Sequence, residues 1–260
     1  MDSGRVSAPV RRLLKPAYLT IKRMLFRVWF AGLKRELPFY RKVLVVAPHP
    51  DDEVLGLSGT ILRFLAFGAD VHILFMTRGE ASHDDLEKSV VSSNRTRISD
   101  RVLASMGIAS GRVTRWALPD GGIPRRNAPG FDDAAVRLGA MLERVRPDVL
   151  FVTHQRETWP YDHVASFEIA EAALGKYSGS CHCYGYAVWL WYSLPLLKIR
   201  TIKRDATYVA PVIMEMKSKR RLIKEYLDPL APNGKPWSGD LPKSMLQSLD
   251  FPYEILTRYH

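Results

Sequence analysis

Short apolar segments rich in β-branched residues alternate along the chain with longer segments of helical periodicity, and this alternation most constrains the fold. The predicted strands are residues 42–48, 70–77, 112–118 and 147–154. The predicted helices between them, with apolar side chains spaced by three and four, are residues 53–67, 87–107 and 131–146. Strands that alternate with helices favour a mostly parallel sheet with helices on both faces. We therefore predict a Rossmann-like α/β fold in a single domain.

The positive charge of the chain is concentrated at its N-terminus. The formal net charge is +11, and residues 1–42 contain eleven lysine and arginine residues against two acidic ones. The rest of the chain is close to neutral, which disfavours nucleic-acid binding by its body. We expect residues 1–41 to form an extension, residues 42–230 the domain, and residues 231–260 a tail that packs on the domain.

The extension has the pattern of a basic amphipathic helix with Pro16 in its first turn. Lys22, Arg23 and Arg27 interrupt its apolar stretch, whereas a bilayer span needs about 20 largely uncharged residues. Two interpretations remain open: the helix lies on an anionic membrane surface, or it packs on the body with its basic face in solvent. Its apolar positions are Leu14, Tyr18, Ile21, Leu25, Val28 and Trp29.

The two cysteines, Cys181 and Cys183, are separated by one residue and are poorly placed to form a disulfide. They lie beside the aromatic run 183–192, which we predict to be a further strand with buried thiols rather than a metal site. A further helix is predicted over residues 214–227. The cysteine usage favours a reducing compartment, and we expect a cytoplasmic protein that binds peripherally to the inner membrane face if its basic helix does so.

A polar loop rich in Asp, His or Arg follows each of the first four predicted strands. These loops read "HPDDE", "RGEASHDD", "PDGGIPRRN" and "HQRETWPYDH". Because ligands of open α/β sheets bind at the carboxyl ends of the strands, four separate stretches of sequence converge on one crevice. The pattern therefore predicts a single functional site at this edge of the sheet.

The first of these loops places three consecutive carboxylates, residues 51–53, shortly after His49. Neighbouring carboxylates raise one another's pKa unless a cation neutralises them. Imidazole nitrogen and carboxylate oxygen are zinc ligands, so His49 and Asp52 predict a metal site that takes a further histidine from elsewhere. The fourth loop supplies that histidine: His163, which opens a helix, is the first choice and His154 is its competitor.

Four segments of the chain resemble motifs of one known family. They are "APHPDDEVLGLSGTI", "LPDGGI" (118–123), "PYDH" (160–163) and "KRRLIKEY" (219–226). The resemblance is to the PIG-L/LmbE-like zinc-dependent de-N-acetylases, which remove acetyl groups from N-acetylglucosamine-type sugars, and it extends over residues 42–230. It implies Zn2+ on His49, Asp52 and His163, with Asp51 as the general base.

Two positions depart from the family pattern. Pro160 stands where the family has a histidine that assists the oxyanion or the leaving group, and Val164 stands where an arginine often follows the last histidine. Tyr161 and His154 are the candidates to replace the missing catalytic donor. A metal site with impaired catalysis is the alternative.

Three further residues are candidates for substrate binding. Arg95 resembles the arginine of the family's second helix, and it either clamps a substrate or carboxylate or forms an ion pair at the helix end. Asp120 either binds a sugar hydroxyl or belongs to a plain Pro-Asp-Gly turn. Glu53 either orients a metal ligand or favours the start of the helix.

Together these features predict a zinc-dependent hydrolase that removes an N-acetyl group from an amino sugar attached to a lipid or another large carrier. Two alternatives remain: an amidase of a soluble amino-sugar conjugate, and a catalytically weak zinc- or carbohydrate-binding protein. A dinucleotide-binding oxidoreductase is disfavoured, because the turn after the first strand lacks Gly-x-Gly-x-x-Gly. The oligomeric state does not follow from the sequence.

Overall fold

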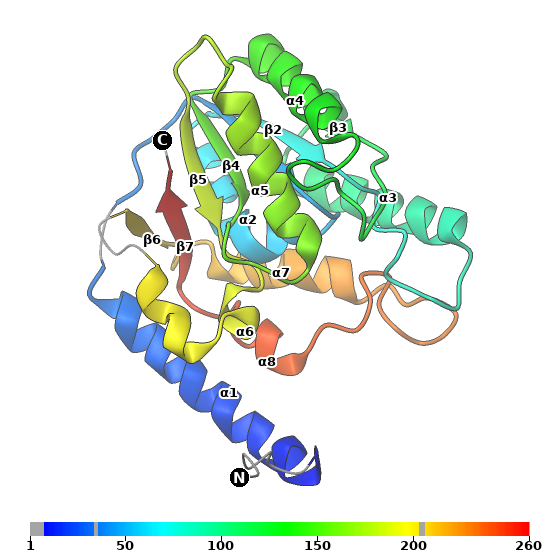
Figure 1. Ribbon diagram of the computed structural model, residues 1–260, viewed down its shortest axis with the longest axis vertical. Helices are drawn as coiled ribbons and strands as arrows, with labels where there is room; N and C mark the ends of the chain where they lie inside the picture. Colours follow the sequence, from blue (N-terminus) through cyan, green and yellow to red (C-terminus); the bar gives the residue numbers. More distant parts are fainter. Residues whose placement is uncertain (1–7, 34–35, 203–205, 260) are drawn as a thin grey trace.

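The computed structural model describes residues 8–33, 36–202 and 206–259, and its centre is one seven-stranded sheet (Figure 1). The sheet has the order β3-β2-β1-β4-β5-β7-β6, in which the first five strands run parallel and β7 is antiparallel to both of its neighbours. The strands are β1 (Lys42–Ala47), β2 (Asp70–Phe75), β3 (Val113–Arg115), β4 (Val149–Thr153), β5 (His182–Tyr186), β6 (Thr207–Pro211) and β7 (Tyr253–Arg258). The predicted α/β fold is confirmed.

The two faces of the sheet are covered by different helices because successive side chains of a strand point to opposite sides. In β1, Val43 and Val45 pack with the side chains of α2, α3 and α7, whereas Leu44 and Val46 pack with those of α4 and α5. These helices are α2 (Asp52–Ala66), α3 (Lys88–Ser105), α4 (Phe131–Val145), α5 (Tyr161–Leu174) and α7 (Met216–Leu227). Because α2 follows β1 and α5 follows β4 along the chain, both helices start near the carboxyl ends of these strands.

The aromatic run predicted as one strand is divided in the structure. β5 ends at Tyr186, and the short helix α6 (Leu190–Ser193) follows. The backbone N–H groups of Val188 and Leu190 donate to the Glu157 carboxylate at 2.6 and 2.8 Å, so they are unavailable for a strand ladder. Cys183 is buried in β5 and Cys181 precedes the strand, and both thiols are free.

Residues 231–260 have a larger part in the fold than the predicted tail. They contribute α8 (Lys243–Leu246) and β7, and β7 lies between β5 and β6 inside the sheet. Glu254 of β7 is buried, accepts hydrogen bonds from the backbone of Gly59 and Thr60 in α2, and pairs with Lys219. The division at residue 230 stays a prediction, but the segment after it belongs to the core.

The N-terminal helix α1 (Ala8–Ala31) begins before Pro16, which lies inside it, and residues 1–7 are outside the described residues. Phe26 and Phe30 are buried in a cluster with residues of α6, β7 and the 3-10 helix η2 (Leu196–Thr201). Figure 1 shows α1 beside α6 at the margin of the molecule. In the described part of the chain, no helix combines the length and apolar character that a membrane span requires.

Candidate active site

A pocket of 380 Å³ opens where the loops after the parallel strands converge. The loops after β1, β2 and β4 all contribute to its lining, as predicted, and so does the turn at Asp120 that follows β3. Residues 238–241 of the C-terminal segment form a further part of the wall. The predicted residues that line it are His49, Asp51, Asp52, Arg95, Asp120 and Tyr161.

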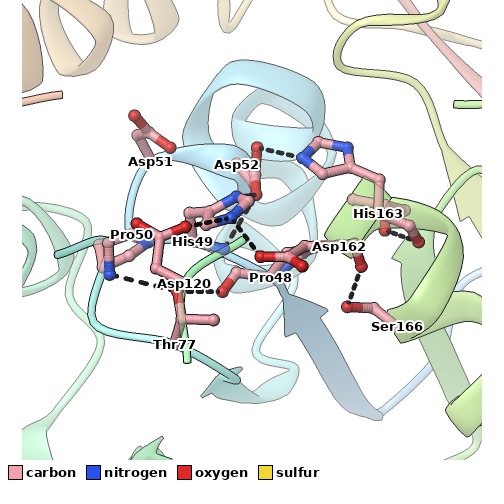
Figure 2. Close-up of polar contacts among 12 residues, drawn as sticks. Pro48, His49, Pro50, Asp51, Asp52, Thr77, Asp120, Asp162, His163 and Ser166 are labelled. Carbon is pink, nitrogen blue, oxygen red and sulfur yellow. Dashed lines mark hydrogen bonds and ion pairs between the residues drawn. The ribbon is translucent and has the colours of Figure 1, made fainter. Parts of the chain in front are cut away.

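His49, Asp52 and His163 lie together (Figure 2), and the first two line the pocket while His163 is fully buried. His49 Nδ1 lies 3.1 Å from Asp52 Oδ2, and His163 Nε2 lies 3.3 Å from Asp52 Oδ1. One ligand atom from each residue lies within 4.8 Å of the others. The start of α2 and the start of α5 therefore bring together two imidazoles and a carboxylate, a donor set typical of zinc.

The hydrogen bonds around His163 fit a metal on its Nε2 atom. His163 is fully buried and its Nδ1 lies 2.6 Å from Glu157 Oε2, while Nε2 makes no hydrogen bond among the described residues beyond its 3.3 Å ion-pair contact with Asp52. Burial lowers the pKa of this imidazole, but Asp52 and Glu157 outweigh burial and raise it to about 9. The carboxylates thus favour a cation at this position, and a metal on Nε2 satisfies both them and the unbonded nitrogen.

The second nitrogen of His49 faces two more carboxylates. His49 Nε2 lies 3.0 Å from Asp120 Oδ1 and 3.1 Å from Asp162 Oδ2. A proton on Nε2 satisfies these contacts and leaves Nδ1 free to face the metal-ligand group. Burial lowers the pKa of His49, but the three surrounding carboxylates outweigh it and raise that pKa well above its usual range.

Asp51 stands apart from His163 in Figure 2, and its backbone has φ 130°, a conformation that non-glycine residues rarely adopt. Arg95 Nη2 donates to Asp51 Oδ2 at 3.1 Å, and the Asp51 N–H donates to Glu53 Oε2 at 3.1 Å. Burial raises the pKa of Asp51 to about 6, against the opposing effect of the Arg95 guanidinium. The turn therefore presents a carboxylate beside the metal-ligand group that can exchange a proton near neutral pH.

The three predicted substrate-binding residues differ in their surroundings. Arg95 is buried and donates to Asp51, to Pro50 O and to Gly79 O, which makes it a clamp on the Asp51 turn. Asp120 is in the pocket and accepts a hydrogen bond from Ala81 N at 2.7 Å. Glu53 is buried behind the pocket, where Tyr226 donates to it and burial raises its pKa to about 8.

The two candidates for the missing catalytic donor have different surroundings. Tyr161 lies at the start of α5, lines the pocket and is largely exposed. His154 is buried, and its ring nitrogens contact Thr257 Oγ1 and Arg156 N. Burial lowers the pKa of His154 to about 3, and it is absent from the pocket lining in the described part of the chain. The structure brings Tyr161 to the site and leaves His154 outside it.

Two carboxylates that support the metal-ligand group were not among the predicted residues. Glu157 bonds His163 as well as the backbone before α6, and Asp162 accepts hydrogen bonds from Gly121 N at 2.7 Å and Ile123 N at 3.1 Å. Both lie in the loop "HQRETWPYDH", so their proximity to His163 in sequence was a signal. Their partners, however, come from distant loops that the sequence alone does not align.

Comparisons with known proteins agree with this geometry. A 1D-myo-inositol 2-acetamido-2-deoxy-alpha-D-glucopyranoside deacetylase of Kineococcus radiotolerans is 28% identical over 244 residues, which cover 82% of this chain and 61% of that protein. A protein of the same name from Thermobispora bispora is 30% identical over 159 residues, half of each chain. The chain thus spans less than two thirds of these relatives' length.

Solved structures share the fold at low sequence identity. An N,N'-diacetylchitobiose deacetylase from Pyrococcus horikoshii has a TM-score of 0.59 at 16% identity, covering all of this chain and 95% of its own. The 4-carboxy-2-hydroxymuconate hydratase GalB from Pseudomonas putida has a TM-score of 0.61 at 15% identity, covering 84% and 96%. These likenesses concern the fold alone.

Residues 44–174, half of the chain, match the family described as PIG-L, GlcNAc-PI de-N-acetylase, and the chain therefore belongs to the PIG-L family.

Proposed function

We propose that this protein is a metal-dependent hydrolase that removes the N-acetyl group from a soluble conjugate of an amino sugar. The observation that carries the proposal is the His49–Asp52–His163 group, in which His163 Nε2 contacts only Asp52 among the described residues, and two of whose members, His49 and Asp52, line the pocket. The donor set fits Zn2+, with His49 Nδ1, an Asp52 oxygen and His163 Nε2 as its ligands.

The chemistry needs a stronger nucleophile and a stabilised oxyanion because an amide is a poor electrophile. When bound, the metal activates water and polarises the amide carbonyl. Asp51 accepts the proton of the attacking water and returns it to the departing amine, and Arg95 holds its carboxylate in place. Asp120 and Asp162 fix the tautomer of His49 by accepting its Nε2 proton.

Tyr161 is the residue that we assign to the role of the histidine replaced by Pro160. Its side chain lies at the start of α5 on the pocket wall, two residues before the metal ligand His163. A phenol can donate a hydrogen bond to the oxyanion. We expect Tyr161→Phe to lower kcat with little change in metal content.

The proposal for the substrate follows from the names of the relatives. The Kineococcus protein is named as a deacetylase of an inositol 2-acetamido-2-deoxy-glucopyranoside and the Pyrococcus protein as a deacetylase of N,N'-diacetylchitobiose, and neither name mentions a lipid. The test is acetate release by the zinc-loaded protein from free, glycoside-linked and lipid-linked N-acetylhexosamines. Release from the soluble conjugates supports the proposal, and zinc-loaded protein that releases acetate from none of them contradicts it.

A second candidate substrate, an amino sugar linked to a membrane lipid, is favoured by the exposed side of α1. The stripe formed by Tyr18, Ile21, Met24, Leu25 and Val28 is between 44% and 72% exposed, while Phe26 and Phe30 hold the helix on the body. Basic residues surround this stripe in sequence, and an anionic lipid surface complements both properties.

The position of α1 relative to the pocket supports this second candidate. Lys22 Nζ donates to the backbone carbonyl of Tyr192 at 2.8 Å, and the Tyr192 ring lies 5.9 Å from that of Trp189 in the pocket lining. These contacts place the buried side of α1 next to this side of the pocket.

Sedimentation with vesicles tests the membrane contact. We expect the wild-type protein to bind vesicles that contain phosphatidylglycerol, and a variant with serine at Ile21, Met24, Leu25 and Val28 to lose this binding. A matched control places serine at four exposed apolar residues elsewhere, namely Val136, Ile213, Met214 and Leu230. Equal sedimentation of both variants and the wild type would exclude the stripe as a membrane anchor.

A further inference from the structure

One wall of the pocket is aromatic and is not used by the proposed reaction. Trp159 is 50% exposed and Trp189 is 6% exposed, and both line the pocket. Their rings meet edge to face, with centroids 4.8 Å apart and an interplanar angle of 88°. This contact fixes the orientation of the Trp159 ring, so that a large apolar surface is held open to the pocket.

A single carboxylate couples this aromatic wall to the metal-ligand group. Glu157 Oε2 accepts from His163 Nδ1 at 2.6 Å, and Oε1 accepts from Val188 N and Leu190 N, the residues on either side of Trp189. Glu157 is fully buried, which makes these bonds strong and the geometry definite. The distance between the aromatic wall and the reacting centre is therefore set by the fold.

The pocket is also lined by polar side chains. Ser82, Asp120, Ser238 and Asp240 line it, and the loop that carries Ser238 is held against the loop after β2. Ser82 Oγ donates to Trp237 O at 2.9 Å, and His83 Nε2 contacts Pro236 O at 3.0 Å. A substrate whose amide reaches the metal ligands thus meets both hydrogen-bonding groups and indole rings in this pocket.

We propose that Trp159, supported by Trp189, forms a subsite for the part of the substrate beyond the acetamido sugar, and that this part presents an apolar face. The pyranose face of a second sugar and the ring of an apolar aglycone share this chemistry. The proposal rests on the proposed function for the identity of the reacting group. The exposed indole gains a partner when such a face covers it, whereas a free monosaccharide bound by its amide leaves the indole in water.

The experiment compares Trp159→Ala with the wild type on three probes: methyl N-acetylglucosaminide, the disaccharide of N-acetylglucosamine, and 4-nitrophenyl N-acetylglucosaminide. In the wild type we expect KM to be lower for at least one larger probe than for the methyl glycoside. Trp159→Ala abolishes that advantage, raising the KM of the larger probe about 10-fold and changing that of the methyl glycoside less than about twofold. Trp159→Phe retains part of the KM advantage of the larger probe.

The two larger probes separate the sources of the apolar face. Loss of the advantage for the disaccharide alone assigns a second sugar, and loss for the nitrophenyl glycoside alone assigns an aglycone. Phe67→Ala is the matched control, because Phe67 is an exposed aromatic residue at the far end of α2. An equal change for all three probes in Trp159→Ala, or no change for any, would overturn the subsite.

Binding measurements keep the test independent of turnover. Methyl glucoside, cellobiose and 4-nitrophenyl glucoside lack the acetamido group, and their affinities are measured by calorimetry on the zinc-loaded protein. Trp159-dependent binding of a larger glucoside without acetate release from any acetamido probe would support the subsite and contradict the proposed function. Acetate release with no dependence of affinity or KM on Trp159 would support the proposed function and overturn the subsite.

Discussion

The strand-edge site and helix α1 both bury charged groups, but α1 also exposes a stripe of large apolar side chains. At the strand edge, Asp51, Asp52 and His163 are buried, and each contacts a partner of opposite charge or a hydrogen-bonding group. On α1, Lys22 is likewise buried and donates to Tyr192 O, but the apolar side chains of Ile21 and Val28 face solvent. Buried charge is costly unless it is paired, and exposed apolar surface is costly unless it is covered.

This difference separates the groups that carry out chemistry from those that determine location. The described contacts of α1 are with α6, α8, β7 and η2, and none of them involves the metal-ligand group His49, Asp52 and His163. Changes at the site should therefore abolish turnover on every substrate, while changes on the exposed stripe should affect only encounters with a surface.

The largest effect is expected from His163→Ala, which removes a metal ligand and leaves Asp52 and Glu157 buried without their partner. Metal content and acetate release should fall together, and the loss should exceed the roughly 10- to 100-fold caused by changes to outer hydrogen-bond partners. Metal analysis by mass spectrometry beside the acetate assay measures both. A variant with full metal content and no activity would remove His163 from the ligand set.

Glu157→Gln tests the support of His163 and should have the next largest effect. The amide oxygen can keep the bonds to Val188 N and Leu190 N, which directs the amide nitrogen at His163 Nδ1. His163 must then carry its proton on Nε2, where the metal binds, so zinc affinity should fall about 10- to 100-fold. Competition with a chromogenic chelator measures the affinity. Unchanged affinity would show that Glu157 does not select the tautomer.

The fourfold serine variant of the exposed stripe should leave the site unaffected. We expect kcat and KM on a soluble N-acetylated glycoside to change less than about twofold, because Ile21, Met24, Leu25 and Val28 contribute nothing to the pocket lining. Steady-state kinetics without vesicles measure this. A large loss of activity would mean that α1 and the site are not independent.

The smallest effect is expected for Lys22→Met and depends on pH. Burial lowers the pKa of Lys22 from 10.5 to about 8, so the unfolded chain binds more protons than the folded one between these values. The cost of burying this charge is complete below pH 8 and is relieved as the pH rises toward 10.5. The stability of the wild type relative to Lys22→Met, measured by urea unfolding, should therefore increase with pH over this interval. A difference in unfolding free energy that stays constant with pH would contradict the lowered pKa of Lys22.

The parallel part of the sheet could be predicted because its strands are continuous apolar runs that end in polar loops. The same reasoning located His49, Asp52 and His163, since carboxyl ends of parallel strands meet at one edge. It did not locate Glu157 or its bonds beyond β5, because these depend on how the loop after β4 folds against α6.

The C-terminal segment and α1 were less predictable for a similar reason. The segment after residue 230 is rich in proline and glycine, which indicates turns, and β7 gains its place from pairing with β5 and β6 rather than from its own pattern. In α1 the apolar positions chosen from periodicity proved to be largely the exposed ones, while Phe26 and Phe30 pack inward. Periodicity identifies an apolar face but does not say which neighbour covers it.

The division of labour between Asp51 and its neighbour Asp52 is the central claim, and Asp51→Asn tests it most directly. The measurement is zinc content and acetate release on the same preparation. We predict full zinc content with turnover reduced about 10²- to 10⁴-fold, as for removal of a general base. Loss of zinc in Asp51→Asn, or retention of turnover with zinc bound, would contradict this assignment.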